Sequence, residues 1–300
     1  MSVVVVGTAA LDSIKTPTRE NPRLLGGSGC HAAVAASFFA PAVRLVGVVG
    51  DDFPKRYVDF LRKRRIDLEG LESRPGKTFH WAGEYEVNMN VRRTLATELG
   101  VLADYQPHLP AACRRSPYVL LANNAPSLQH QALNQIVRPR LVVADSMDFW
   151  INTALKDLLR LLRRIDIFVL NDSEACLLTG EANAITALKK IHHFGPPYVI
   201  VKKGEHGSVV SGPDGLFLAP AYPLDQVVDP TGAGDSFVGA MLGYLARQRG
   251  AVRQHLRAAV LHGSVAASFC CEGFGLNRTA RVTPAAVRQR VRALQRMIRV

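Results

Sequence analysis

The sequence predicts an α/β fold, a three-layer α/β/α sandwich in which helices cover both faces of a mainly parallel sheet. Two observations support this prediction. Short runs rich in Val, Ile and Leu recur along the chain, and segments with the apolar period of a helix separate most of them. Several runs are apolar at every position, as is typical of strands buried on both faces. Strands that alternate with helices form parallel sheets of this kind.

The alternation can be followed in order from the first residues. A β-branched run at 3–6 predicts a strand, and the small residues of 29–40 predict a buried helix that Pro41 ends. A second apolar strand at 44–49 precedes an amphipathic helix at 53–64. The same pattern then continues, with strands near 117–121, 140–144, 166–170 and 198–202 and helices near 127–137, 150–163 and 173–193.

Two stretches interrupt this alternation. Residues 11–25 and 77–98 are richer in polar and β-forming residues and show no helical period. We expect them to form the strands of a small second sheet, which would act as a lid. Residues 207–219 predict a hairpin, and the last third returns to helices at 232–248, 251–271 and 284–298. Without a repeat or a low-complexity linker, residues 1–300 are expected to form one domain.

The composition limits the class of protein. Of the 300 residues, 48% are hydrophobic and 21% are charged, which is the balance of an ordinary globular protein and excludes wholesale disorder. The net charge of +12 favours anionic ligands, among them nucleotides, phosphorylated metabolites and nucleic acids. Five cysteines without metal-ligand spacing and a start without a basic signal region predict a cytoplasmic protein. No membrane span is expected, because the uncharged stretch 24–43 contains several glycines and a proline.

The segment most informative about chemistry is Asp229-Pro230-Thr231-Gly232-Ala233-Gly234-Asp235-Ser236-Phe237. Apolar residues follow it at helical spacing, which puts Gly232-Ala233-Gly234 at a helix N-terminus. There the first amides lack partners and the helix dipole is positive, so the turn is suited to bind phosphate. The carboxylate of Asp235 would repel phosphate, but it could accept the proton of a hydroxyl that attacks it. The alternative is that Asp235 only caps the helix.

Three further motifs occur at other points of the chain. Gly26-Gly27-Ser28-Gly29 precedes a helix of small residues, Asn171-Asp172-Ser173-Glu174 follows a strand, and Val201-Lys202-Lys203-Gly204-Glu205-His206-Gly207 leads from a strand into a hairpin. Together with segment 229–237, these motifs resemble, in order, the signatures of the pfkB-type carbohydrate kinases of the ribokinase superfamily. The resemblance spans residues 1 to roughly 280.

The resemblance implies a catalytic site at residues 232–235. Asp235 would be the general base, and the turn Gly232-Ala233-Gly234 would form an anion hole for the transferred phosphoryl group. Asn171 and Glu174 would hold Mg²⁺ through water. A monovalent cation, K⁺, would bind at carbonyl oxygens near Asp229 and Thr231.

The resemblance also implies a binding site for each substrate. On the acceptor side, Asp12 would bind sugar hydroxyls, Gly26 and Gly27 would allow a close approach, and Asn123 could reach the sugar. On the ATP side, Lys202 could steer the nucleotide or simply be solvated. The remaining nucleotide-binding residues are expected in turns around the base and phosphates, at Gly204, Gly207, Gly273 and Asn277.

One position departs from the family pattern. Ribokinase-like members commonly have a sugar-binding Asn four residues after the second glycine of the di-glycine motif, where this chain has His31. His31 could contact the sugar, or it could be a packed helix residue. The departure affects the identity of the substrate and leaves the reaction class unchanged.

The resulting hypothesis is an ATP-dependent kinase, using ATP and Mg²⁺, that phosphorylates a hydroxyl of a sugar. A nucleoside kinase of the same superfamily is the alternative. Because lids pair between subunits in some family members, a homodimer through the lid is a further expectation. Two remote alternatives are an NAD-dependent oxidoreductase, from the partial dinucleotide fingerprint at 27–32, and a nucleic-acid binder, from the arginines of 288–299.

Overall fold

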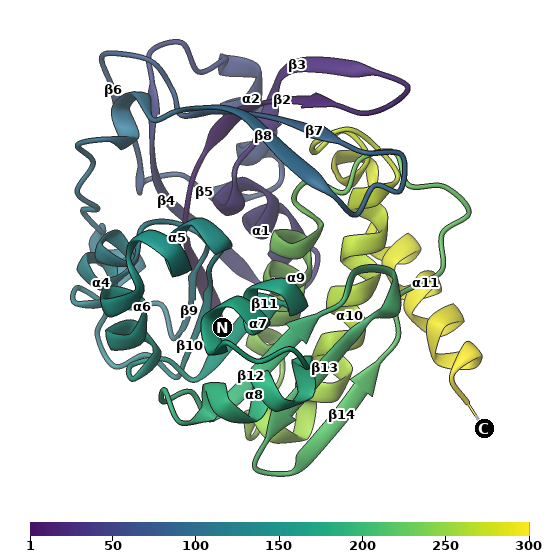
Figure 1. Cartoon of the computed structure of the whole chain (residues 1–300). Coiled ribbons are helices and arrows are strands. Elements are labelled where there is room, and N and C mark those ends of the chain that lie inside the picture. The colour runs from purple at the N-terminus through teal and green to yellow at the C-terminus, as the bar shows by residue number, and fades with distance from the viewer. Residues whose placement is uncertain (300) are drawn as a thin grey trace.

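The computed structural model describes residues 1–299 and is built around one large sheet with helices on both faces (Figure 1). The strand order is β14-β13-β12-β11-β10-β9-β1-β4-β5, and β6 pairs with β4. All pairs are parallel except those of β13 with β12 and β14. The strands are β1 (Ser2–Val6), β4 (Ala42–Gly50), β5 (Ile66–Asp67), β6 (Leu71–Arg74), β9 (Tyr118–Leu121), β10 (Leu141–Asp145), β11 (Ile167–Asn171), β12 (Tyr198–Lys202), β13 (Ser208–Gly212) and β14 (Gly215–Ala219).

Successive residues of the central strands pack into different layers. Val3 and Val5 of β1 belong to one hydrophobic core, whereas Val4 and Val6 belong to another. The first core is shared with α1 (Ser28–Ala36), α2 (Lys55–Lys63), α9 (Ala233–Arg247), α10 (Val252–Cys271) and α11 (Pro284–Met297). The second is shared with α3 (Ala111–Arg114), α4 (Pro126–Leu133), α5 (Asp148–Thr153), α6 (Leu155–Leu162), α7 (Asp172–Thr179) and α8 (Ala184–His192). The predicted three-layer α/β/α sandwich is confirmed.

Several element boundaries differ from the prediction. The helix expected at 150–163 is two helices, α5 and α6, which meet at the non-helical residue Ala154. The helix expected at 173–193 is also two, because Gly180 ends α7 in the left-handed conformation and Asn183 caps α8. The strands β5 and β6 and the helix α3 were not predicted. They are too short to show a periodic pattern.

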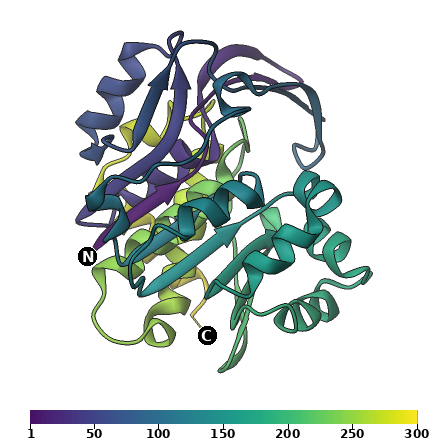
Figure 2. The ribbon, with the colours of Figure 1, turned by 90° about the vertical axis from the view of Figure 1, so that its left-hand side faces the viewer.

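The two stretches at 11–25 and 77–98 contribute a separate four-stranded sheet, seen at the top of Figure 1 and Figure 2. Its strands are β2 (Ala10–Lys15), β3 (Glu20–Gly26), β7 (His80–Tyr85) and β8 (Arg92–Glu98), in the order β3-β2-β7-β8. The inner face packs through Ile14 and Tyr85 on Phe274 of the main body.

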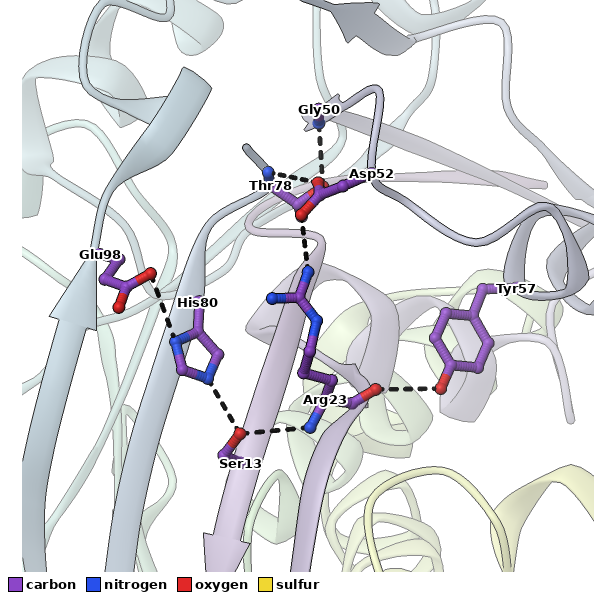
Figure 3. Close-up of polar contacts among 8 residues, drawn as sticks. All are labelled: Ser13, Arg23, Gly50, Asp52, Tyr57, Thr78, His80 and Glu98. Carbon is purple, nitrogen blue, oxygen red and sulfur yellow. Dashed lines mark hydrogen bonds and ion pairs between the residues drawn. The ribbon is translucent and has the colours of Figure 1, made fainter. Parts of the chain in front are cut away.

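A polar network joins this small sheet to the main sheet (Figure 3). The Asp52 carboxylate accepts hydrogen bonds from the amide and hydroxyl of Thr78, both at 2.7 Å, and pairs with Arg23 at 2.6 Å. Burial raises the pKa of Asp52, but the Thr78 and Arg23 hydrogen bonds outweigh burial and hold it below its ordinary value. On the sheet itself, the hydroxyl of Ser13 lies 2.9 Å from Nε2 of His80. The network fixes where the small sheet leaves the body.

The helices α1 and α9 approach each other closely through glycines. A Cβ atom on Gly239 would lie 2.1 Å from the carbonyl oxygen of Ala32, and one on Gly243 would lie 2.6 Å from that of Ala36. No side chain fits in such a gap, because real Cβ atoms do not approach backbone atoms this closely. Glycine at these positions therefore sets the separation of the two helices.

We expect Gly239→Ala to destabilise the protein by ~1–3 kcal/mol, as overpacking of a core does. In an ordinary helix interior the same change would stabilise by about 1 kcal/mol. The sign of the change in unfolding free energy, measured by urea denaturation, therefore tests the packing. A neutral or stabilising result would show that α1 and α9 can separate at little cost.

Candidate active site

The site forms where α9 begins, at the carboxyl ends of the parallel strands. Gly232, the N-cap of α9, has a φ of +76°, and a Cβ there would lie 2.3 Å from the ring of His31. Both the conformation and the contact require glycine. Among residues 1–299, the amides of Gly234 and Asp235 have no backbone acceptor, whereas the amide of Ala233 donates to the Pro230 carbonyl at 3.1 Å. Two free amides are thus available for an anion.

The carboxylate of Asp235 is half-buried beside these amides. Burial and the negative charge of Asp145 raise the pKa of Asp235 to about 6, although Lys202 and Arg92 act in the opposite direction. A carboxylate with this pKa is ionised at neutral pH and is a stronger base than an ordinary aspartate. These properties suit a group that accepts a proton from a hydroxyl.

A buried ion pair lies at the same edge. Nζ of Lys202, at the end of β12, is 3.1 Å from Oδ2 of Asp145, at the end of β10. The same Nζ would lie 2.8 Å from a Cβ on Gly234, so the ammonium is next to the first turn of α9. Asp145 was not predicted. Its position directly after an apolar strand is the only sequence signal it carries.

Asn171 and Glu174 form a reciprocal cap on α7. The side chain of Asn171 accepts from the Glu174 amide at 2.7 Å, and the Glu174 carboxylate accepts from the Asn171 amide at 2.7 Å. Burial raises the pKa of Glu174 to about 7, the charge of Asp145 adds to this, and Lys202 offsets part of it. A buried carboxylate of raised pKa beside a phosphate site gains from a nearby cation.

The side chains of Asn171 and Glu174 offer oxygen ligands of the kind that Mg²⁺ takes. Within residues 1–299 no cluster of three or more His, Cys, Asp or Glu side chains could hold a metal ion by itself. Mg²⁺ is commonly bound by one or two carboxylates, by water and by substrate phosphates, so a dedicated cage is not required. Glu174, with Asn171 beside it, fits such an ion.

On the acceptor side, Asp12 lies against the di-glycine turn. Its Oδ2 accepts from the amide of Gly27 at 3.2 Å, and a Cβ on Gly26 would lie 1.9 Å from the same oxygen. Burial raises the pKa of Asp12 to about 7, with smaller contributions from the charges of Asp229 and Asp235. Asp235 therefore lies close enough to Asp12 for its charge to raise the pKa of Asp12.

His31 and Asn123, the two other predicted acceptor-side residues, both have partners within the protein. His31 is 1% exposed, packs its ring on Gly232, and burial lowers its pKa to about 4, so the ring is neutral. This burial favours the packed-helix interpretation. The amide of Asn123 is engaged with α5, accepting from Nε1 of Trp150 at 3.1 Å and contacting the sulfur of Met147.

A cleft of about 1150 Å³ opens on the other side of the α9 N-terminus. Lys202, Gly204 and Gly207 line it together with Ala233 and Gly234. The predicted residues Gly273 and Asn277 do not, because Gly273 turns against Arg278 and Asn277 is exposed. Four apolar or small residues of this wall come from the stretch 266–277, which the sequence predicts to border the adenine: Ala267, Ser268, Cys271 and Phe274. Phe237 and Ser264 also line the wall and were not predicted to do so.

The loop before α9 is held on every side. The Asp229 carboxylate accepts from the amides of Thr231 and Gly275, each at 2.9 Å. The Thr231 hydroxyl donates to the Tyr85 hydroxyl of the small sheet at 3.0 Å, and the Thr231 carbonyl accepts from the thiol of Cys270 at 3.3 Å. The small sheet and the turn before α9 are thus physically connected.

Two remote alternatives lose their structural basis. The glycines of 27–32 do begin a helix, α1, but this helix follows β3 of the small sheet and not the first strand of the parallel sheet, as a dinucleotide site requires. In the basic helix α11, Arg290 pairs with Glu272 at 2.6 Å and stacks on Phe269, so it supports the fold.

In the part of the chain described, no helix is long and apolar enough to cross a membrane.

Comparison with known proteins identifies the family. The model of the pfkB family of carbohydrate kinases matches residues 2–282. The chain belongs to the pfkB family. The kinase is 30% identical over 259 residues to a cytidine kinase of Thermococcus kodakarensis, which covers 83% of this chain and 90% of the relative. The resemblance stated from the sequence is confirmed, and the chain is an ATP-dependent phosphotransferase acting on a sugar-like substrate.

Solved structures show the same fold. The nucleoside kinase of Methanocaldococcus jannaschii, an archaeal member of the ribokinase family, superposes with a TM-score of 0.77 at 23% identity and covers 97% of this kinase and 98% of that chain. An E. coli protein described as a ribokinase II, in complex with ATP and Mg²⁺, has a TM-score of 0.79 at 16% identity, with 97% and 99% covered.

If Asp235 is the base, Asp235→Asn should lower kcat by at least ~100-fold, the lower end for loss of a general base, because the amide keeps the shape but takes no proton. ATP affinity, measured by calorimetry, should stay near wild type. Asp214→Asn, at an exposed position in the turn between β13 and β14, is the matched control and should leave kcat unchanged. Near-normal turnover of Asp235→Asn would refute the assignment.

The pH profile should show both site carboxylates. The pKa of Asp12 is about 7 and that of Asp235 about 6, so kcat/KM for the acceptor should fall as the pH drops through this range and each group gains a proton. In Asp12→Asn the remaining acid limb should lie near the lower value. A profile that is flat from pH 8 to pH 5 would contradict the raised values.

Proposed function

We propose that the kinase transfers the γ-phosphoryl group of ATP to a hydroxyl of a ribose-containing acceptor, with Asp235 as general base. One observation carries this proposal. The carboxylate of Asp235, the free amides of Gly234 and Asp235 and the ammonium of Lys202 converge at the N-terminus of α9. A base, an anion hole and a cation are the groups that phosphoryl transfer requires.

In the proposed mechanism, the acceptor oxygen lies between Asp12 and Asp235. Asp235 takes the hydroxyl proton as the oxygen forms a bond to the γ-phosphorus, and the bond from that phosphorus to the bridging oxygen of ADP breaks. The free amides and Lys202 stabilise the negative charge on the phosphoryl oxygens. Mg²⁺, held near Asn171 and Glu174, would supply further neutralisation of that charge.

The nucleotide would occupy the cleft of about 1150 Å³. Gly204 and Gly207 line it at the η2 turn (Gly204–His206), and both have positive φ angles. The apolar side chains of Phe237 and Phe274 offer a surface for a base. The E. coli protein of the same fold was solved in complex with ATP and Mg²⁺, which supports a nucleotide as a ligand of this fold.

The acceptor could be a free sugar or a nucleoside, and two observations favour the nucleoside. The cytidine kinase relative is aligned over 90% of its length. In addition, Phe149 is 52% exposed beside Trp150, whose indole is bound to the acceptor-side residue Asn123. An exposed aromatic ring near the sugar site offers a stacking surface for a base.

Several finer features are also proposed. The small sheet would act as a lid, because Tyr85 and Thr231 join it to the anion-binding turn. K⁺ would bind near the carbonyls of Asp229 and Thr231, a homodimer would form through the small sheet, and the protein would be cytoplasmic. The dependence of kcat on K⁺ against Na⁺ tests the cation site. A light-scattering measurement of mass tests the homodimer.

We expect Asp12→Asn to raise the acceptor KM by roughly 10-fold or more, since a charged hydrogen bond to a hydroxyl contributes about 1.5–3 kcal/mol. The KM for ATP should change little. The assay is ADP release over a panel of pentoses, hexoses and nucleosides. Cytidine or another nucleoside as preferred acceptor would support the proposal, and ADP release with hexoses alone would contradict it.

A further inference from the structure

Asp145 is a buried acid with no role in the mechanism so far. It ends β10, is 4% exposed, and both carboxylate oxygens have partners, since Oδ1 accepts from the amide of Ser146 at 2.9 Å and Oδ2 from Lys202 at 3.1 Å. Its carbonyl accepts from the side chain of Gln129 at 3.0 Å. The carboxylate is therefore held in one orientation.

The partner of Asp145 comes from two strands away. The strands β10, β11 and β12 are adjacent and parallel, and Lys202 lies two residues beyond Ile200, the residue of β12 in register with Asp145. Two strand spacings and two residues of rise separate the Cα atoms of Asp145 and Lys202 by about 12 Å. The lysine side chain extends across the end of β11 to reach the acid. On its way it passes Gly234, where a Cβ would meet its Nζ, Cε and Cδ at 2.8, 3.6 and 3.9 Å.

The ion pair with Asp145 leaves some hydrogen-bond donors of Lys202 unused. A lysine ammonium has three N–H donors. Within the described chain one donor is used by Asp145, and Nζ makes no second hydrogen bond. Because Nζ lines the cleft and lies beside the first turn of α9, the remaining donors are next to the free amides of Gly234 and Asp235.

We propose that Asp145 is a positioning residue, which holds the Lys202 ammonium beside the α9 N-terminus so that its free donors meet the transferred phosphoryl group. A flexible lysine alone would sample many rotamers, and the ion pair offsets the entropy cost of fixing it before ATP arrives. Preorganised donors of this kind contribute most where charge develops. The proposal rests on the assignment of phosphoryl transfer to residues 232–235.

The same ion pair acts on the base through charge. Asp145 raises the pKa of Asp235 and Lys202 lowers it, while burial is the largest cause of its shift. For Lys202, burial lowers the pKa, but Asp145, Glu174 and Asp235 outweigh burial and keep the amine charged. The other charged or titratable groups near Asp235 come from separate elements and stay constant in the test: Arg92, Asp12 and Cys270.

The test compares Asp145→Asn, Lys202→Met and the double variant. Asp145→Asn should lower kcat by ~10-fold or more, as misplacement of a catalytic group does, without raising the KM for ATP. Its acid limb should move to lower pH, because a negative charge near Asp235 is gone. Lys202→Met should move the limb to higher pH, and the double variant should lie between. Asp145→Glu, which keeps the charge, should recover part of kcat.

A control variant and a measurement without turnover complete the experiment. Glu181→Gln breaks the surface pair of Glu181 with Lys190, at 3.0 Å, and should change neither kcat nor the pH profile. Affinity for ADP with aluminium fluoride, an analogue of the transferring phosphoryl group, should fall ~10-fold in Asp145→Asn, while affinity for ADP alone stays constant.

These readouts separate the positioning role from the proposed function. If the wild type phosphorylates no acceptor, the proposed function fails, and the fluoride-complex affinities still decide the role of Asp145. Wild-type kcat in Asp145→Asn, an acid limb that moves in the same direction as in Lys202→Met, or unchanged affinity for the fluoride complex would each overturn the positioning role.

Discussion

The close approach of α9 to α1 is the constraint on which the rest of the site depends. Gly232 packs on the ring of His31, and Gly239 and Gly243 lie against the backbone of α1. These contacts bring the first turn of α9 to the carboxyl edge of the sheet, where Asp145, Asn171 and Lys202 end three adjacent strands. If α9 began one turn away, its first amides and the Asp235 carboxylate would lie far from Lys202. The small size of the glycines is therefore what assembles the phosphate site.

The electrostatics of the site follow from this assembly. Burial raises the pKa of Asp12, Asp235 and Glu174, and the partly exposed ammonium of Lys202 pairs with Asp145 among these acids. A triphosphate adds further negative charge. Cations offset this charge, so a magnesium-carrying nucleotide and a preorganised lysine suit the site. The contact of Tyr85 with Thr231 joins this charged region to the small sheet, and in the proposed lid role that sheet would exclude water from it.

The sequence contained enough information for the layers of the fold, because apolar strand runs and helical periods are local signals. It also located the α9 turn, since a glycine-rich helix start followed by an acid is a local pattern. The division of 173–193 depended on the left-handed Gly180, and the sequence alone does not distinguish this from a tolerated helix glycine. Asp145 could not be predicted, because its meeting with Lys202 depends on the order of β10, β11 and β12 in the sheet. The burial of His31 likewise depends on how α1 and α9 pack.

The central claim is that the amides of residues 234–235 bind the migrating phosphoryl group while Asp235 deprotonates the acceptor. A crystal structure with ADP, Mg²⁺, aluminium fluoride and the best acceptor tests it most directly. The account predicts that the fluoride group lies within hydrogen-bond distance of those amides and of Lys202, with the acceptor hydroxyl on the Asp235 carboxylate. A fluoride group bound elsewhere, or an acceptor hydroxyl out of reach of Asp235, would contradict it.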